Sequence, residues 1–475
     1  MSTTLAASGR INQLLDSGSF VEIGGLVTAR ATDFNMKPAE MPSDGCVTGY
    51  GTIDENLVYV YSQDASVLGG TIGEMHARKI VNLYDLALKM GAPVIGFIDC
   101  AGLRLQEATD ALNAFGQVYA KQVAASGVIP QITAIVGTCG GGLALFPTLT
   151  DFTYMLKDGA KLFVNSPNAL AGNTAEKNNT SSAQFQALEA GLTDVVDSEE
   201  ALYEKIRGLL GFLPANNFDV NDVECMDDLN RTFDNLEGFA GDTAELLKVI
   251  ADDNDFFEIK AGFAPEMVTG FIRLDGVTVG CVANRSEILP EGEEEGKKFD
   301  TVLTTNGCYK AEEFIKFCDA FEIPVLSFTN VTGYEATVAS EKTIARAAAK
   351  LTAAFAGATV PKVNVVVGKA FGTAANVMNS KAVGADITIA WNDAQIGTMD
   401  GKLAAKIMYE GQGSDVIDAK AKEYEELTLN VTGAARRGYV DQIIAPSETR
   451  KYVIGAFEML LSKQEMSYDK KHVTI

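Results

Sequence analysis

The sequence contains few of the side chains that enzymes commonly use to bind metals and move protons. Its 475 residues include only two histidines, His76 and His472. The seven cysteines are scattered, and none forms a C-x-x-C pair. A zinc site needs several such ligands at close spacing, so we expect no metal site. Scattered, odd-numbered cysteines in a large chain favour a reducing compartment, and we expect a cytoplasmic protein.

Positive charge is also scarce. The chain has 39 Lys and Arg against 63 Asp and Glu, which gives a net charge of −24. A surface of this sign repels phosphate backbones and anionic lipid heads, so we expect no nucleic-acid partner. A few local Lys or Arg side chains can still hold the phosphates of a small ligand.

Signals for secretion or membrane insertion are missing or interrupted. Residues 1–10 contain no apolar signal core. Residues 122–150 carry no charge, but they include Pro130, three successive glycines at 140–142 and Pro147. A spanning helix tolerates this punctuation poorly. We interpret the uncharged run as a buried strand, a turn and a buried helix.

Segments that recur in the same order predict an internal duplication. The matched pairs are Phe20–Ile23 with Phe256–Ile259, Val47–Tyr50 with Val268–Phe271, Pro93–Phe97 with Pro324–Phe328, and Pro130–Gly137 with Pro361–Gly368. The second of these pairs is separated by 221 residues and the last two by 231, so we place about ten additional residues near 291–296. We expect two domains, residues 1–225 and 226–475, joined within the polar segment 216–242.

Each copy alternates short apolar segments with amphipathic ones. In the first copy, residues 57–62, 94–98 and 132–136 are predicted to be buried strands. Residues 74–90 carry apolar side chains at helical spacing. This order predicts an α/β fold with a largely parallel sheet, which binds ligands at the carboxyl ends of its strands.

A glycine-rich turn, Gly137–Gly142, follows the third of these strands. We expect a helix to begin at about Gly142, where backbone amides without helical partners would face a ligand oxygen. Residues 369–374 occupy the matching place in the second copy. Neither turn fits a dinucleotide-binding or P-loop pattern. The sequence therefore predicts two amide nests, meaning groups of backbone N–H donors for an oxyanion, with a purely structural helix start as the alternative.

Several segments resemble those of biotin-dependent carboxyltransferases. Asp99–Glu107 is similar to the family's D-S-G-G-A-R-I-Q-E, and Ala125–Ile132 matches its A-S-G-V-I-P-Q-I. Cys139–Gly142 with Leu149–Phe152 resembles C-A-G-G-A and L-T-D-F. In the second copy the matching segments are Phe317–Phe321, Ala358–Lys362 and Lys369–Gly372. The likeness covers nearly the whole chain and includes the subunits of propionyl-CoA carboxylase, methylmalonyl-CoA decarboxylase and transcarboxylase.

The resemblance implies two tandem crotonase-like domains, in agreement with the duplication. It also implies transfer of a carboxyl group between biotin and the α-carbon of an acyl-CoA. The thioester enolate and the biotin left after transfer both carry a negative oxygen, which fixed amides stabilise. By resemblance, Gly141 and Gly142 hold the thioester oxygen, and Thr373 and Ala374 hold the biotin oxygen. Biotin itself would take the α-proton.

The resemblance further assigns residues to substrate binding. They are Gly102, Leu103, Arg104, Gly140, Gly333, Tyr334 and Gly372. Arg104 either contacts the coenzyme or an acyl carboxylate, or forms a structural ion pair with Glu107. Tyr334 and Thr373 depart from the family's V-P-G-F and R-K-A-Y-G-G, as do Ala347 and Ala348 from I-I-R-H-G-A-K. The amide at 373 keeps its direction only if φ is negative there.

Biotin is expected on a separate carrier protein. Ala87–Met90 resembles the A-M-K-M of a biotinyl lysine, but it ends a predicted helix, whereas a biotinyl lysine sits on a hairpin tip. The implied partners are a biotin carboxyl carrier protein and either biotin carboxylase or the subunits of a membrane sodium-pump decarboxylase, to which the chain would be peripheral. Since the family's site lies between the first domain of one subunit and the second domain of another, we expect at least a dimer and usually a hexamer.

The sequence leaves alternatives open for the acyl group that is transferred and for the function itself. Residues 209–217 resemble the methylmalonyl-CoA decarboxylase branch, which favours methylmalonyl-CoA or propionyl-CoA over acetyl-CoA or glutaconyl-CoA. The direction of transfer depends on the partners. A hydratase or isomerase on the same fold would need a carboxylate for proton transfer, and Glu107 is the candidate. A non-catalytic assembly subunit would have a second nest that no longer works.

Overall fold

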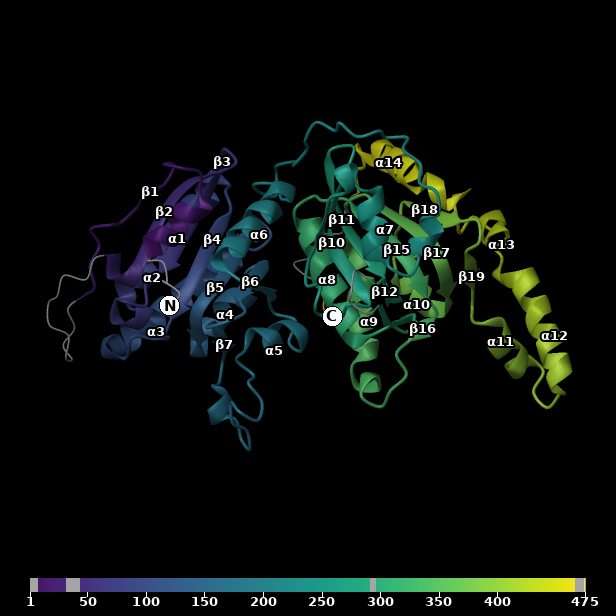
Figure 1. Cartoon of the computed structure of the whole chain (residues 1–475), viewed down its shortest axis with the longest axis horizontal. Coiled ribbons are helices and arrows are strands. Elements are labelled where there is room, and N and C mark those ends of the chain that lie inside the picture. Colours follow the sequence, from purple (N-terminus) through teal and green to yellow (C-terminus); the bar gives the residue numbers. More distant parts are fainter. Residues whose placement is uncertain (1–6, 31–42, 291–295, 466–473, 475) are drawn as a thin grey trace. The chain divides into compact units, whose positions relative to one another are not determined.

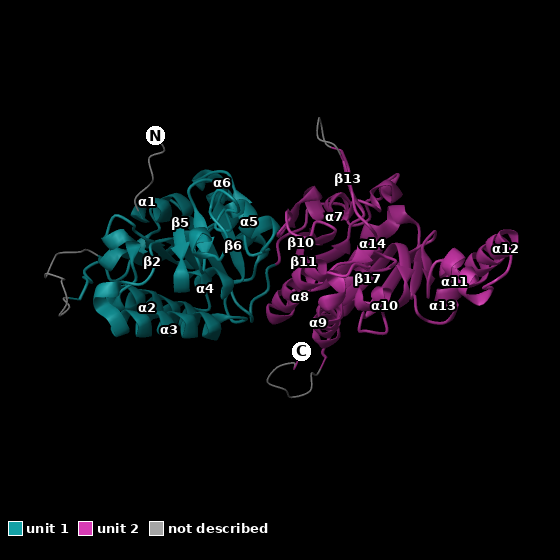
Figure 2. Cartoon of the chain, turned by 90° about the horizontal axis from the view of Figure 1, so that it is seen from below, with its two compact units in different colours: residues 1–221 teal, residues 222–475 magenta. Residues whose placement is uncertain are grey.

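Two separate sheets organise the chain. The structure is a computed structural model that describes residues 7–30, 43–290, 296–465 and 474. It divides into unit 1, residues 1–221, and unit 2, residues 222–475 (Figure 2). Each unit contains one eight-stranded sheet with helices on its faces, which confirms the predicted α/β class.

The sheet of unit 1 begins antiparallel and continues parallel, as buried apolar strands joined by helices require. In spatial order its strands are β1 (Val21–Glu22), β2 (Cys46–Ile53), β3 (Asn56–Gln63), β4 (Val94–Cys100), β5 (Gln131–Gly140), β6 (Phe152–Leu156) and β8 (Asp194–Val196), with β7 (Lys161–Phe163) beside the far end of β5. One face is covered by α2 (Glu74–Met90) and α3 (Ala108–Ala125), the other by α1 (Ala7–Leu14) and α6 (Glu199–Phe212) (Figure 2).

Unit 2 repeats this order strand for strand. Its sheet runs β9 (Phe256–Glu258), β10 (Met267–Leu274), β11 (Val277–Asn284), β15 (Val325–Val331), β17 (Lys362–Phe371), β18 (Ile387–Trp391) and β20 (Gln442–Ile444), with β19 (Gln395–Gly397) beside β17. The covering helices are α7 (Thr243–Ile250), α8 (Thr305–Ala320), α9 (Ile344–Gly357) and α14 (Thr449–Leu460). Three further helices stand between β19 and β20 and project from this unit (Figure 1): α11 (Gly401–Met408), α12 (Ser414–Tyr424) and α13 (Val431–Arg436).

The additional residues of the second copy lie between a strand and a helix. The ends of β3 and β11 are 221 residues apart, whereas the starts of α2 and α8 are 231 apart. The difference falls in residues 285–304, where β12 (Glu287–Ile288) and β13 (Lys297–Lys298) form a short hairpin. Residues 291–295, part of the predicted place, lie outside the described residues.

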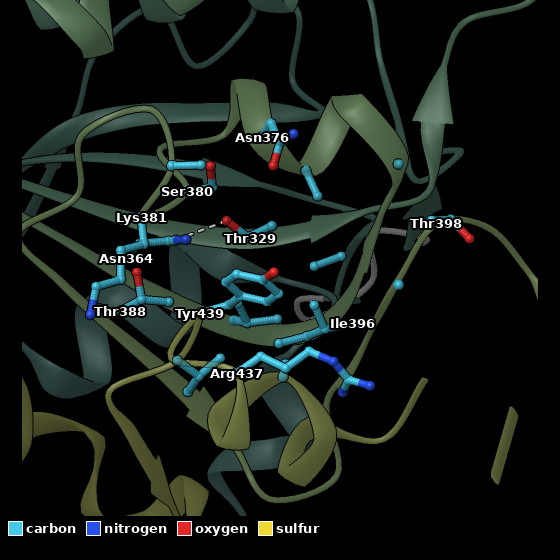
Figure 3. Close-up of a pocket in the computed structure, with 18 of the residues that line it drawn as sticks. Thr329, Asn364, Asn376, Ser380, Lys381, Thr388, Ile396, Thr398, Arg437 and Tyr439 are labelled. Carbon is cyan, nitrogen blue, oxygen red and sulfur yellow. Dashed lines mark hydrogen bonds between the residues drawn. The ribbon is translucent and has the colours of Figure 1, made fainter. Parts of the chain in front are cut away.

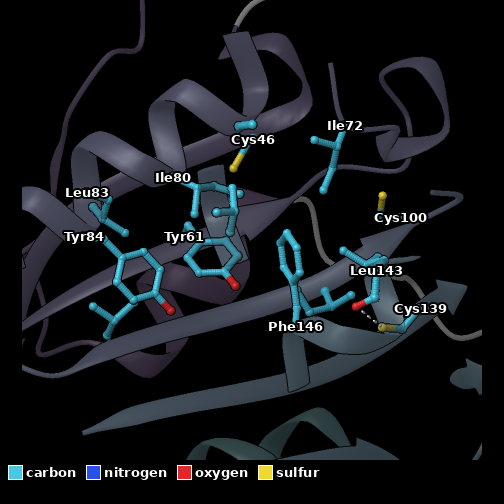
Figure 4. Packing of buried hydrophobic residues seen from close by; sticks show 14 of the residues in the cluster. Cys46, Tyr61, Ile72, Ile80, Leu83, Tyr84, Cys100, Cys139, Leu143 and Phe146 are labelled. Carbon is cyan, nitrogen blue, oxygen red and sulfur yellow. Dashed lines mark hydrogen bonds between the residues drawn. The ribbon is translucent and has the colours of Figure 1, made fainter. Parts of the chain in front are cut away.

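The core of unit 1 packs α2 and α3 onto the sheet. Tyr61 of β3, with Ile80, Leu83 and Tyr84 of α2, is at most 1 % exposed (Figure 4). Each large apolar side chain buried in this way contributes about 1.5–3 kcal/mol. Residues 122–150 end α3, form β5 and close with the short α4 (Leu145–Thr148), as the interrupted pattern predicts. Across the described ranges, no helix is both long and apolar enough to cross a bilayer.

An arginine and an aspartate join three elements of unit 1. Arg207 of α6 donates to the carbonyl of Leu14, at the end of α1, and to Asp16 Oδ1, both at 2.9 Å. Asp16 in turn accepts the backbone amides of Asp54 and Glu55, in the turn between β2 and β3, at 3.1 and 3.0 Å. These amide and arginine contacts hold the pKa of Asp16 well below its usual range. The contact therefore ties both helices to the hairpin.

The same arrangement recurs in unit 2 with deeper burial. Arg450 of α14 donates to the carbonyl of Ile250 and to Asp252 Oδ1, both at 2.6 Å. Asp252 accepts the amides of Asp275 and Gly276, in the turn between β10 and β11, at 3.3 and 2.8 Å. Arg450 is 0 % and Asp252 7 % exposed, against 30 % and 28 % for Arg207 and Asp16.

This difference in burial gives a matched pair of stability predictions. Replacement of Arg450 by Met should lower the free energy of unfolding by about 3–5 kcal/mol, because it leaves the Asp252 carboxylate buried without its partner. Arg207→Met should cost only about 1 kcal/mol, since water reaches both partners. Urea unfolding followed by hydrogen exchange in each unit measures both values. Equal losses for the two variants would contradict the assignment.

Candidate functional site

A side chain of β4 holds the turn at the end of β5. The register of this pair shifts between Ile98 and Cys100, so Asp99 leans across to the neighbouring strand. Its Oδ1 accepts the amide of Thr138 at 3.3 Å. A Cβ atom built at Gly137 would lie 1.9 Å from the same oxygen. Only glycine permits this approach.

The equivalent contact in unit 2 uses an amide in place of the carboxyl group. The register of β15 and β17 shifts between Thr329 and Val331, and Asn330 Oδ1 accepts the amide of Lys369 at 3.1 Å. A Cβ atom at Gly368 would lie 2.7 Å from Asn330 Oδ1. Each of these residues stands 231 positions after its counterpart, so both turns are built in the same way.

The first nest follows directly. Gly141 has a φ of +66° and begins a short 3-10 helix, Gly141–Ala144, one residue before the predicted helix start. The carbonyl of Gly142 accepts the hydroxyl of Tyr119, from α3, at 2.6 Å. Gly102, with a φ of +109°, brings its backbone close enough that an added Cβ would lie 3.6 Å from the carbonyl oxygen of Gly140. The structure thus brings these four predicted glycines together.

The second nest has the same backbone turn. Gly372, with a φ of +61°, occupies the place of Gly141 and begins α10 (Gly372–Val377). Thr373 is the second residue of α10, and its φ is not left-handed. The amide of Thr373 therefore keeps the direction that a helical glycine would give it, and the condition set by the sequence is met. Ala374 follows it in the same turn.

A cavity of about 760 Å³ is lined by Gly372 and Thr373 of this nest. Its walls include residues of four strands, β15, β17, β18 and β19, and Thr388 of β18 is among the polar residues that line it (Figure 3). Thr388 Oγ1 and Ser380 Oγ are buried and have no hydrogen-bond partner among the described residues. Buried hydroxyl groups normally have partners, so these two residues of the cavity lining are exceptions.

Most of the remaining wall is neutral. Val366, Ala370, Ala375 and Ile396 supply apolar surface, while Arg437 stands after α13 (Figure 3). Lys381 also reaches the cavity, but its ammonium pairs with Asp441. A volume of this size with a few fixed polar groups is typical of small-ligand sites.

Arg104 is buried in a cluster of charged side chains. Its guanidinium is 1 % exposed and pairs with Asp44 Oδ1 at 2.7 Å and Glu107 Oε1 at 2.9 Å. A further nitrogen donates to the carbonyl of Thr71 at 2.7 Å. Arg104 therefore forms the structural ion pair, the second of the two alternatives, and it has a second partner, Asp44, that was not predicted.

Glu107 is fully engaged in the same cluster. Its second oxygen, Oε2, accepts the amide of Glu74 at the start of α2, at 2.6 Å. The cluster also fixes the neighbouring loop, since Ile72 donates to the carbonyl of Gly102 at 2.9 Å and accepts the amide of Arg104 at 3.0 Å. Its role is to hold Gly102 in position beside the first nest. Leu103 is paired with Ile72 in the same contact.

Two predicted departures lie away from the cavity. Ala347 and Ala348 are 0 % and 7 % exposed on the buried face of α9.

Gly333 and Tyr334 form the two-residue strand β16, which pairs with β14 (Val302–Leu303). Tyr119, Thr388 and Ser380 were not predicted from the sequence, because nothing in their local pattern separates them from ordinary helix and strand residues.

The whole chain matches one known family. The carboxyl transferase domain covers residues 3–475. The propionyl-CoA carboxylase beta chain of Roseobacter denitrificans is 40 % identical over 487 residues, which cover 99 % of this chain and 93 % of that protein. Methylmalonyl-CoA decarboxylase subunit alpha of Veillonella parvula is 38 % identical over 484 residues, with the same coverage. The solved structure of hexameric transcarboxylase 12S with hydrolyzed methylmalonyl-coenzyme A bound is similar with a TM-score of 0.90 at 34 % identity, covering 99 % of this chain and 92 % of that one.

The cluster around Arg104 also contains a histidine that should stay neutral. His76 is 0 % exposed, and its ring nitrogens contact the carbonyl of Asp44 at 3.0 Å and the side-chain amide of Gln63 at 3.1 Å. Burial, with a smaller effect of the Arg104 charge, lowers the pKa of His76 from 6.5 to about 3. As the pH falls below 6.5, the unfolded chain takes up a proton that the folded chain excludes. This contribution to stability is therefore full above pH 6.5 and is lost between pH 6.5 and 3.

The variant His472→Gln, with His76 as its one remaining histidine, tests this prediction. In carbon-13 histidine-labelled protein, the ring signals of His76 should not shift between pH 8 and 5. The same protein in urea should titrate near 6.5 and serves as the control. A midpoint near 6.5 in the folded protein would show that the ring is not enclosed.

Proposed function

The chain belongs to the carboxyl transferase family, and on that premise we propose that it moves a carboxyl group between carrier-bound biotin and the α-carbon of methylmalonyl-CoA or propionyl-CoA. The family confirms the carboxyltransferase prediction and the two tandem crotonase-like domains. The similar carboxylase is named for propionyl-CoA and the similar decarboxylase for methylmalonyl-CoA, which supports this choice over acetyl-CoA and glutaconyl-CoA.

The observation that carries the proposal is the pair of matched nests. Carboxyl transfer develops negative charge on two different oxygens, one on the thioester and one on the ureido group of biotin. Gly141 and Gly372 make the same left-handed turn, with φ values of +66° and +61°, at the end of matched strands. Each nest offers fixed amide donors to one oxyanion, which is the arrangement that lowers such a barrier.

In unit 1, the amides of Gly141 and Gly142 would donate to the thioester oxygen while the enolate forms. The close approach of Gly102 and Gly140 leaves no side chain between the loop and the nest. We assign the acyl-CoA side to residues 1–225 on this basis. Leu103 would contribute to the acyl pocket and, in this proposal, Arg104 supports the loop without touching the ligand.

In unit 2, the amides of Thr373 and Ala374 would donate to the ureido oxygen. Biotin bound here would supply the carboxyl group from its ureido nitrogen and take up the α-proton in exchange. Gly372 lets the backbone turn toward the ligand, and Gly333 and Tyr334 stand beside the nest. The apolar surface of the cavity would suit an uncharged ureido ring, and Thr388 lines the same cavity.

The contacts of Glu107 weigh against a hydratase or isomerase. Such an enzyme needs a carboxylate that can exchange a proton with the substrate. Both oxygens of Glu107 are held inside the protein, one by Arg104 and one by the amide of Glu74. The right-handed turn at Thr373 likewise weighs against an assembly subunit with a lost second nest.

The proposal places biotin on a separate carrier protein. Lys89 lies in the last turn of α2 and not on a hairpin tip, which supports a carrier in trans. The proposed partners are a biotin carboxyl carrier protein and either biotin carboxylase or membrane sodium-pump decarboxylase subunits, with the chain in the cytoplasm. A homo-hexamer is proposed by analogy with transcarboxylase 12S.

Turnover with free biotin tests the function directly. The purified chain should decarboxylate methylmalonyl-CoA in a biotin-dependent reaction, with malonyl-CoA and glutaconyl-CoA as comparison substrates. Turnover of one of the comparison substrates alone would keep carboxyl transfer and change the acyl group. Binding of thioesters without turnover of any of them would contradict the proposed function.

The first nest is tested by a pair of variants at one position. Gly142→Pro should lower kcat by at least about 100-fold, because proline removes one amide donor of the oxyanion hole. Gly142→Ala keeps that amide, and the nearest neighbours of its added Cβ would be the Tyr119 hydroxyl at 3.0 Å and the Phe115 ring at 3.8 Å, so the loss of kcat should be much smaller. Circular dichroism and thioester binding check that both variants fold. Equal activity of the two variants would exclude the amide of Gly142 as a donor.

A further inference from the structure

The two copies differ at two positions that face each other across the second nest. In unit 1, Leu103 pairs with Ile72; in unit 2, Tyr334 pairs with Leu303 in the same parallel register, 231 residues later. By the same offset, Thr373 takes the place of Gly142. The duplication therefore supplies an internal comparison: unit 1 has no hydroxyl group at either position, and unit 2 has one at both.

These two hydroxyl groups contact each other. Tyr334 Oη donates to Thr373 Oγ1 at 3.2 Å. Within the described residues, neither side chain has another hydrogen bond. Thr373 is exposed and lines the cavity, whereas Tyr334 is half-buried beside it. Both residues are also departures from the family segments, so the two departures form a single contact.

The tyrosine of the first nest makes a different bond. Tyr119 comes from α3 and donates to a backbone carbonyl, that of Gly142, at 2.6 Å. Its counterpart 231 residues later is Lys350, whose ammonium lies 5.7 Å from the ring centre of Tyr309. Unit 2 thus has no tyrosine at this helix position and has one on β16 instead. A carbonyl oxygen that accepts a hydrogen bond has no hydrogen of its own to donate to a ligand, whereas a hydroxyl that accepts one can still donate its hydrogen.

A threonine hydroxyl both accepts and donates. When Tyr334 donates to Thr373 Oγ1, the remaining Thr373 proton is strengthened as a donor, because linked hydrogen bonds polarise one another. This proton belongs to a residue whose backbone amide already faces the nest. Thr388, which is 4 % exposed, lines the same cavity, and its Oγ1 has no hydrogen-bond partner among the described residues.

We propose that Thr373 Oγ1, polarised by Tyr334, is a side-chain donor to the ureido oxygen at the second nest. This inference rests on the proposed function and extends it, because it adds a third donor to the two amides. As the N–C bond of carboxybiotin breaks, its electron pair moves into the ureido group, and the hydroxyl stabilises the charge on oxygen without giving up its proton. Thr373 is then a catalytic residue, and Tyr334 is a positioning residue that acts through it.

A double-mutant cycle tests the pair. Thr373→Val keeps the side-chain shape and removes the hydroxyl; Tyr334→Phe keeps the ring. The readouts are kcat and KM for free biotin in decarboxylation of methylmalonyl-CoA. We expect kcat/KM for biotin to fall about 10–100-fold in Thr373→Val, as for loss of one oxyanion donor, and about 3–10-fold in Tyr334→Phe. The double variant should be no worse than Thr373→Val, since both changes affect one donor.

Controls separate this role from a structural one. Thr373→Ser keeps the hydroxyl and should retain most of the activity that Thr373→Val loses. Tyr409→Phe, outside the cavity lining, should match the wild type. Thioester affinity should not change in any of these variants, because unit 1 is untouched.

The outcomes distinguish the inference from the function on which it rests. Biotin-dependent activity in the wild type together with wild-type activity in Thr373→Val, or additive losses in the double variant, would overturn the inference alone. An inactive wild type with every thioester would overturn the proposed function and this inference together.

Discussion

In each unit, a single close contact holds the last residues of one strand, β5 in unit 1 and β17 in unit 2, against the neighbouring strand. The side chain at a bulge of one strand reaches the backbone of the next, and a glycine is the one residue that leaves room for it. Asp99 against Gly137 and Asn330 against Gly368 are the two instances. Four residues further on, the backbone of each unit turns through a left-handed glycine, Gly141 in unit 1 and Gly372 in unit 2, and begins a helix. Without the contact at the bulge, nothing would direct the following amides to one point.

The two instances also show what the contact requires. Burial raises the pKa of the Asp99 carboxyl group, so its charge is a cost to the fold. Asn330 makes the same bond with a neutral oxygen, which avoids that cost. Both units therefore share the position of the accepting oxygen, and the contact does not depend on the negative charge that Asp99 can carry. The same holds for the arginine contacts at Asp16 and Asp252, where the geometry is shared and the degree of burial differs.

The amino-acid sequence predicted the fold and the turns because both depend on local pattern. The matched offsets, the apolar strands and the glycines at 140–142 are all visible within short windows. Only one of the two carboxylate partners of Arg104 could be predicted from the sequence. Glu107 lies three residues away on the chain, whereas Asp44 lies sixty residues away and is brought close by folding. The cavity residue Thr388 could not be predicted for the same reason. In the sequence it looks like any other strand threonine, and only the structure shows that its hydroxyl lacks a partner among the described residues. At position 373, where the family has glycine, the sequence could not show whether the threonine amide keeps its direction. The φ angle in the structure shows that it does.

An acidic chain with two histidines can perform this chemistry because the proposed donors do not titrate. Backbone amides keep their polarity at every pH, and their field needs no counter-charge in the site. The protein's many carboxylates can therefore stay at the surface or in paired clusters, and the buried carboxylates of Asp44 and Glu107 are paired with Arg104. A site made of amides does, however, offer few ways to vary its strength. A side-chain hydroxyl added beside the nest is one of the few changes that alters the donor set without disturbing the turn, which is why the pairing of Tyr334 with Thr373 is informative about how the second unit has diverged from the first.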